Sequence, residues 1–136
     1  MGDAVTNLSI PTTTTVRTIA AVPVLLRLEA ALAASVAIGI YAWLGFSWWL
    51  FAALILTPDL FMLGYLAGPR IGAATYNFGH TYIVPAALGA AGFLLHEPMI
   101  MAVAAIWTAH IGLDRVMGYG LKLPGSFKAT HLSPLR

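Results

Sequence analysis

Residues 24–44 read VLLRLEAALAASVAIGIYAWL, and this stretch decides the fold class. Its length is close to the ~20 residues that an α-helix needs to cross the ~30 Å of hydrocarbon in a bilayer. Charged side chains interrupt it only at Arg27 and Glu29, which both lie near its start. The stretch therefore predicts a transmembrane helix.

Three more apolar stretches of similar length follow, at residues 47–66, 76–95 and 98–121. The segments between them are short, which in a helical bundle makes successive helices antiparallel neighbours. We therefore predict an all-α, four-helix transmembrane bundle over residues 23–122. A polar amino-terminal tail, residues 1–22, and a polar carboxyl-terminal tail, residues 123–136, flank this domain.

Two features inside the predicted helices bear on how they pack. Pro58 predicts a bend in the second helix, because proline removes a backbone hydrogen bond. Small residues at a spacing of four favour close helix contact in lipid, and in the first helix these are Ala31, Ser35 and Gly39. Ala105 and Ala109 form a similar pair in the last helix. We expect both groups to line helix interfaces.

The composition excludes several classes of protein. Of the 136 residues, 60% are hydrophobic and only 9% are charged, whereas roughly a quarter are charged in a soluble domain. The formal net charge is +2, and its lysines and arginines are scattered singly, so no stripe for nucleic-acid phosphates exists. The absence of cysteine excludes disulfides, thiol catalysis and cysteine-based metal sites.

The distribution of lysine and arginine predicts the orientation. The loop at Arg70 and the flanks of both termini carry these residues, whereas the loops at 45–46 and 96–97 carry none. Short cytoplasmic loops are the ones enriched in positive charge. We therefore expect both termini to be cytoplasmic, with Trp48 and Trp49 at the outer surface.

Ionisable residues gather in the inner half of the predicted bundle. The helical rise places them roughly 5–12 Å inside the cytoplasmic boundary. Each charge at such a depth costs at least ~2.5–3.5 kcal/mol, which makes intramembrane ionisable residues candidates for function. We expect six polar residues to converge in one cavity open to the cytoplasm: Glu29, Asp59, Asn77, His80, His110 and Asp114.

The spacing within this group indicates a divalent metal such as zinc. His110 and Asp114 are four residues apart and share a helix face, and imidazole and carboxylate groups are ligands of zinc and iron. We predict His80, His110 and Asp114 as metal ligands, with Asp59 or Glu29 as general base. The alternative is a hydrogen-bonded or proton-handling network without metal.

Two histidines in a helical bundle also raise the question of haem. His80 and His110 would then be axial ligands. The carboxylates of Asp59 and Asp114 make the surroundings more polar than a haem pocket. We therefore regard haem as disfavoured.

Three segments together resemble a known family. They are PDLFMLGYLAGPRIGAATYNFGHTY (58–82), IWTAHIGLDRVMGYGLK (106–122) and THL (130–132). They are similar to small bacterial integral membrane proteins of domain-of-unknown-function family 4260. The resemblance implies a compact four-helix protein of the bacterial inner membrane, and no activity. It also implies a polar network that supports the site: Arg27, Arg70, Asn77, Arg115, Lys122 and His131.

These observations leave three hypotheses for function. The first is a metal-dependent membrane hydrolase that acts on an amphiphilic substrate. The second is a small proton-coupled transporter with Asp59 and Glu29 as titrating carboxylates. The third is a structural or accessory subunit of a larger membrane complex. The expected partners are the lipid bilayer and either a second copy of the chain or other membrane proteins, and no nucleic acid.

Overall fold

The computed structural model describes residues 13–124 and residue 130, and it describes side chains from Val22 onward. This part of the chain is all-α, which confirms the predicted fold class. Its extended backbone is limited to an isolated bridge between Lys122 and Thr130. The helices, in chain order, are α1 (Thr13–Leu44), α2 (Trp48–Leu54), the 3-10 helix η1 (Thr57–Ala67), α3 (Pro69–Gly79), α4 (Ile83–Leu94) and α5 (Pro98–Met117).

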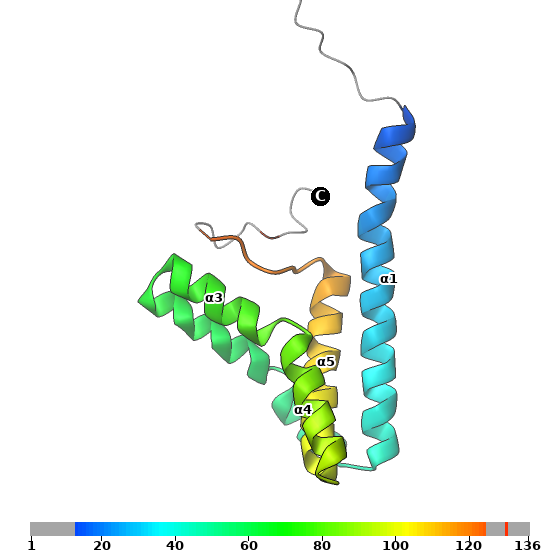
Figure 1. Cartoon of the computed structure of the whole chain (residues 1–136), viewed down its shortest axis with the longest axis vertical. Coiled ribbons are helices and arrows are strands. Elements are labelled where there is room, and N and C mark those ends of the chain that lie inside the picture. Colours follow the sequence, from blue (N-terminus) through cyan, green and yellow to red (C-terminus); the bar gives the residue numbers. More distant parts are fainter. Residues whose placement is uncertain (1–12, 125–129, 131–136) are drawn as a thin grey trace, which may run out of the picture.

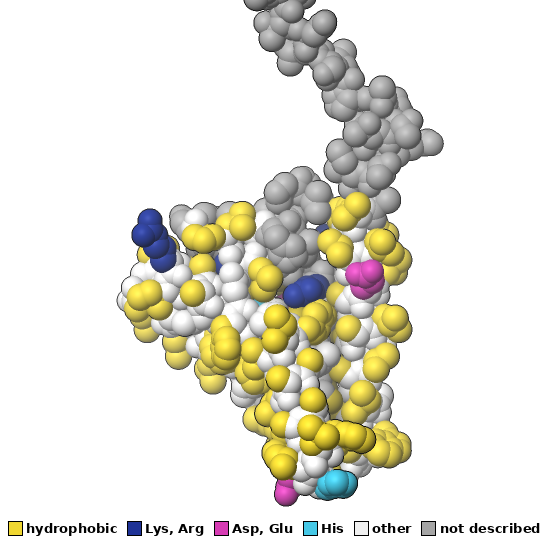
Figure 2. Space-filling model, in the orientation of Figure 1, with side chains coloured by type: hydrophobic (Ala, Val, Ile, Leu, Met, Phe, Trp, Pro, Cys, Tyr) yellow, Lys and Arg dark blue, Asp and Glu magenta, His cyan; other side chains and the backbone are white. Residues whose placement is uncertain are grey.

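Three segments of the described chain are long and apolar enough to cross a membrane, by length and composition: Val22–Leu44, Trp48–Ala67 and Pro98–Met117. Figure 2 shows hydrophobic side chains over most of the visible surface. Leu32 is 65% exposed and Ile83 is 75% exposed, which is costly in water and favourable in lipid. The surface therefore suits a bilayer.

The second and third predicted helices are each divided in the structure. The stretch 47–66 contains α2 and η1, which are separated near Pro58, where the backbone lacks a donor. The stretch 76–95 is divided between α3 and α4, because residues 80–82 leave the helical path. Figure 1 shows the result: η1 and α3 run side by side and lean away from the layer of α1, α4 and α5.

Glycines bring η1 and α3 into close contact. A Cβ added at Gly64 would overlap the Thr75 side chain, and one added at Gly79 would overlap the Phe61 ring. Thr75 Oγ1 also donates a hydrogen bond of 2.9 Å to the Phe61 carbonyl. The outer side of η1 carries Leu60, Leu63 and Leu66, which are 62%, 61% and 88% exposed.

Alanine and glycine bring α1 against α5. Ala30, Ala34 and Ala37 are 3–4% exposed, and Ala109 is fully buried, as expected for a helix interface. The predicted interface of α1, Ala31, Ser35 and Gly39, is wrong by one helical position, because Ser35 and Gly39 are exposed. A spacing of four identifies a stripe on a helix, but α1 carries two such stripes and only one faces α5.

Gly112 and Gly39 provide a test of this interface. A Cβ at Gly112 would lie 2.8 Å from the Ala30 carbonyl oxygen and 3.0 Å from the Ala34 nitrogen, both backbone atoms of α1. We expect Gly112→Ala to lower the free energy of unfolding by about 1–3 kcal/mol, the usual cost of overpacking. Gly39→Ala is the matched control, because a Cβ there would meet no atom within 4 Å. Thermal unfolding in detergent measures both, and equal stabilities would contradict the interface.

Candidate metal centre

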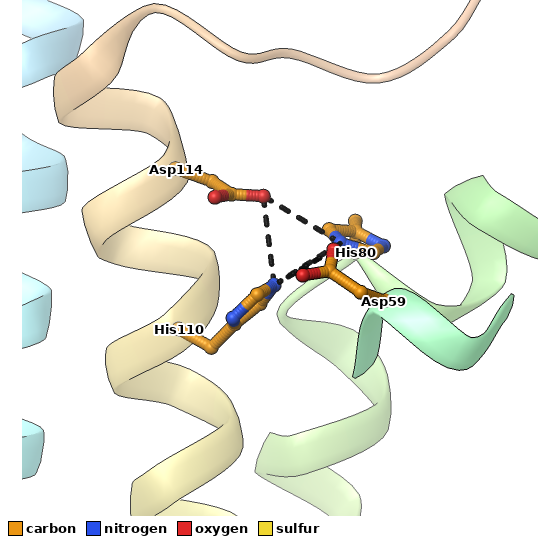
Figure 3. A group of neighbouring side chains, drawn as sticks. All are labelled: Asp59, His80, His110 and Asp114. Atoms are coloured by element: carbon orange, nitrogen blue, oxygen red, sulfur yellow. Dashed lines mark hydrogen bonds and ion pairs between the residues drawn. The ribbon is translucent and has the colours of Figure 1, made fainter. Parts of the chain in front are cut away.

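Four ionisable side chains from three elements meet where the η1–α3 pair joins the main layer. Asp59 comes from the first turn of η1, His80 directly follows α3, and His110 and Asp114 come from neighbouring turns of α5. One ligand atom from each residue lies within 4.8 Å of all the others. Figure 3 shows the four side chains pointing toward a common centre.

Five of the six separations between these ligand atoms are nearly equal. The two Nε2 atoms of His80 and His110 are 3.3 Å apart. Asp59 Oδ1 lies 3.4 Å from His80 Nε2 and 3.5 Å from His110 Nε2. Asp114 Oδ2 lies 3.5 Å from each of the same nitrogens. Four ligands at ~2.1 Å from a tetrahedral zinc ion are separated by about 3.4 Å. Five of the six separations among the donor atoms fit this value, and the sixth, between the Asp59 and Asp114 oxygens, is within 4.8 Å.

The same distances fit a proton network less well. A charge-assisted hydrogen bond from an imidazolium to a carboxylate is about 2.7–2.9 Å long. All four nitrogen–oxygen separations here exceed that range, at 3.4–3.5 Å. A single cation at the centre would satisfy all four donor atoms at once.

Neighbouring groups fix the orientation of the His80 ring. His80 Nδ1 lies 3.0 Å from the Tyr76 carbonyl oxygen, which can only accept, so Nδ1 carries the proton and Nε2 is left for a metal. The Tyr76 ring stacks on the imidazole at a centroid distance of 3.8 Å. A carbonyl that orients a ligating imidazole in this way is the common second shell of zinc sites.

The backbone around His80 is also held by α5. The Trp107 indole nitrogen donates a hydrogen bond of 2.6 Å to the Gly79 carbonyl. Arg115 Nη2 lies 3.5 Å from the His80 carbonyl, and its guanidinium lies 4.5 Å from the centre of the Tyr82 ring. The sequence did not single out Tyr76 or Trp107; the spacing of four between Tyr76 and His80 is the signal that could have identified Tyr76.

The four ligand groups differ in exposure. His80 and His110 are 3% and 4% exposed, and the Asp114 side chain is 16% exposed. The Asp59 side chain is 41% exposed. The helices therefore enclose the donor atoms of His80, His110 and Asp114, whereas the Asp59 carboxylate faces outward.

Asn77 lies near this cluster but its amide serves another purpose. Its Nδ2 donates to the Lys122 carbonyl at 2.9 Å, and its Oδ1 accepts from the Lys122 amide at 2.7 Å. The Lys122 ammonium lies 5.2 Å from the centre of the Tyr76 ring. Burial lowers the pKa of Lys122, and the Asp114 carboxylate opposes this shift. These two hydrogen bonds of Asn77 hold the segment after α5 beside the site.

The structure does not bring every expected residue together. Glu29 is exposed on α1 and is absent from the cluster, so the expectation of convergence is wrong for it. Arg27 and Arg70 are also exposed. His131 lies outside the described residues. The rotation of α1 about its own axis, which sequence spacing does not determine, keeps Glu29 out of the cluster.

The distance between the histidines also bears on haem. Axial nitrogens bind iron from opposite faces of the macrocycle. The His80 and His110 Nε2 atoms are 3.3 Å apart, which leaves no room for a porphyrin between them. The pair suits a single small ion.

Comparison with known proteins gives one match. No curated protein and no solved structure matches this chain significantly. A family model described as a domain of unknown function, DUF4260, matches residues 23–135, a range that includes the four clustered side chains. The chain therefore belongs to the DUF4260 family.

Proposed function

We propose that this protein is a zinc-dependent membrane hydrolase. The observation that carries the proposal is a set of five nearly equal separations, 3.3–3.5 Å, which join the His80 and His110 nitrogens to each other and to the oxygens of Asp59 and Asp114. Zinc held in such a site lowers the pKa of a bound water to about 7 and so supplies a nucleophile at neutral pH.

Differences in exposure support different roles for the four clustered side chains. His80, His110 and Asp114 are enclosed and serve as the three protein ligands. Catalytic zinc sites hold three protein ligands and leave the fourth position to water or substrate. The Asp59 side chain is 41% exposed. For hydrolysis it would leave that fourth position to water and, from beside it, its carboxylate would accept the proton of the attacking water.

The position of the site indicates an amphiphilic substrate. Asp114 is in the last turn of α5, and His110 lies about 10 Å from the end of that helix by the helical rise. A bond at this depth is near the boundary between headgroups and hydrocarbon. The apolar surface of the surrounding helices suits the hydrophobic part of such a substrate.

A small proton-coupled transporter is the second candidate. Side chains supply all four donor atoms of the cluster, as they do in closed metal sites. In this function Asp59 remains a ligand and its protonation releases the ion. The behaviour of Asp59 variants therefore separates the two candidates.

We further propose that both termini are cytoplasmic, in a bacterial inner membrane, and that the site opens to the cytoplasm. Arg115 is in the last turn of α5 and Lys122 is bonded to Asn77 beside the site, and positive charge of this kind favours the cytoplasmic side. Trp43 and Trp49 are 79% and 85% exposed near the turn between α1 and α2, where an outer headgroup layer would lie.

The metal site makes a direct prediction. Protein dialysed against zinc should retain about one ion per chain, and His110→Asn should weaken binding more than about 100-fold, because the lost imidazole is a ligand. His96→Asn is the matched control, since His96 is an exposed loop residue with a φ of 57° that asparagine tolerates. Elemental analysis measures the ion, and full retention by His110→Asn would refute the site.

The role of Asp59 makes a second prediction. Zinc-loaded protein in micelles should hydrolyse one of a panel of amphiphilic esters, amides and phosphoesters, and Asp59→Asn should lower kcat by about 10²–10⁴ while zinc stays bound. Glu97→Gln, at an exposed carboxylate outside the site, should leave kcat unchanged. Loss of zinc from Asp59→Asn, together with zinc or proton flux in liposomes, would favour the transporter. The absence of turnover across the panel with zinc bound would exclude the hydrolase.

The orientation makes a third prediction. A single cysteine at position 96, between α4 and α5, should react with a membrane-impermeant maleimide added to intact cells. A cysteine at position 70, in the first turn of α3, should react only after lysis. The reverse pattern would show that the site faces outward.

A further inference from the structure

A second feature lies on the other side of α5. A groove of about 560 Å³ is lined by residues of α1, α4 and α5, and its volume is within the usual range of ligand pockets. Small residues create it: Ala33, Gly89 and Ala104 are in its wall. A Cβ at Gly89 would lie 3.5 Å from the Ala104 Cβ, an ordinary van der Waals contact, so the missing side chain at Gly89 adds room to the groove.

The groove is separate from the metal centre. Ala104 and Thr108 line it from α5, whereas His110 and Asp114 belong to the candidate site. Thr108 precedes His110 by two residues, which is about 200° around a helix, so these two side chains point in nearly opposite directions. An occupant of the groove would therefore not contact the metal ligands.

One carboxylate lies in this otherwise apolar wall. Glu29 lines the groove and is exposed. The Glu29 carboxylate makes no hydrogen bond or ion pair with any other residue in the described part of the chain. A carboxylate within a spanning helix is costly unless a cation or water reaches it. The groove thus offers apolar walls and one unmatched negative charge.

The length of the groove matches one leaflet of a bilayer. On α1 it extends from Glu29 to Ile40, which is about 16 Å at the helical rise. Half of a ~30 Å hydrocarbon core is about 15 Å. The groove is therefore about as long as an acyl chain in one leaflet. Glu29 lies five residues inside the predicted span 24–44, about 8 Å below its cytoplasmic end, so the headgroup ammonium would reach down to this carboxylate.

We propose that this groove binds one acyl chain of an amine-headed phospholipid, with the headgroup ammonium paired to the Glu29 carboxylate. The apolar wall and the leaflet-length groove select a lipid chain. The carboxylate favours a zwitterionic headgroup that carries an ammonium over an anionic headgroup that carries none. The inference is independent of the metal centre.

Lipid retention tests the proposal. The full chain is reconstituted in nanodiscs with equal amounts of phosphatidylethanolamine and phosphatidylglycerol, and mass spectrometry identifies the lipid that remains bound after release into mild detergent. We expect phosphatidylethanolamine to be enriched about fivefold, as one ion pair at a partly exposed site allows. Glu29→Gln should remove this preference while lipid is still retained, and Glu97→Gln, outside the groove, should keep it.

A second variant keeps the test independent of Glu29. Gly89→Leu fills the groove and should abolish retention of both lipids, and thermal unfolding reports whether this variant folds. Equal retention of the two lipids by the unaltered protein would overturn the proposal. So would an unchanged preference in Glu29→Gln, or a crosslink between cysteines at position 33 of two copies, which would show that a second copy occupies the groove.

Discussion

The hydrogen bond from the Trp107 indole to the Gly79 carbonyl, 2.6 Å long, joins the two parts of this molecule. One part is the layer of α1, α4 and α5, and the other is the pair of η1 and α3 (Figure 1). The Phe61 ring reinforces the bond by stacking on Trp107 at 5.9 Å. Because Gly79 precedes His80, this bond also determines where the first imidazole lies relative to the second.

Hydropathy predicted the class of fold because it measures a property that the bilayer imposes on every spanning segment. It did not predict the division of 76–95, since Asn77, His80 and Tyr82 interrupt the path without making the stretch polar on average. The breaks depend on contacts between distant segments, such as Phe61 with Gly79. A window average along one segment contains no information about those contacts.

The candidate site was predictable to the extent that its residues share an element. The spacing of His110 and Asp114 placed them on one face of α5, and their depth favoured a common layer with Asp59 and His80. The position of Asp59 beside the two imidazoles, and the separation of Glu29 from it, depend on how helices are rotated about their axes. That rotation is determined by packing. The α1 interface, which contains Ala30 and Ala34 in place of the predicted Ala31 and Ser35, is a second example.

The 3-10 geometry of η1 gives this segment a repeat of three residues. Its exposed leucines, Leu60, Leu63 and Leu66, follow that repeat and form a straight ridge, whereas in an α-helix they would spiral away from one another. Phe61 and Gly64, one position later, form the parallel row that contacts α3. Gain of one residue before Leu63 would rotate the following part of η1 by a third of a turn and bring Leu63 and Leu66 against α3, so the length of this segment is as constrained as its chemistry.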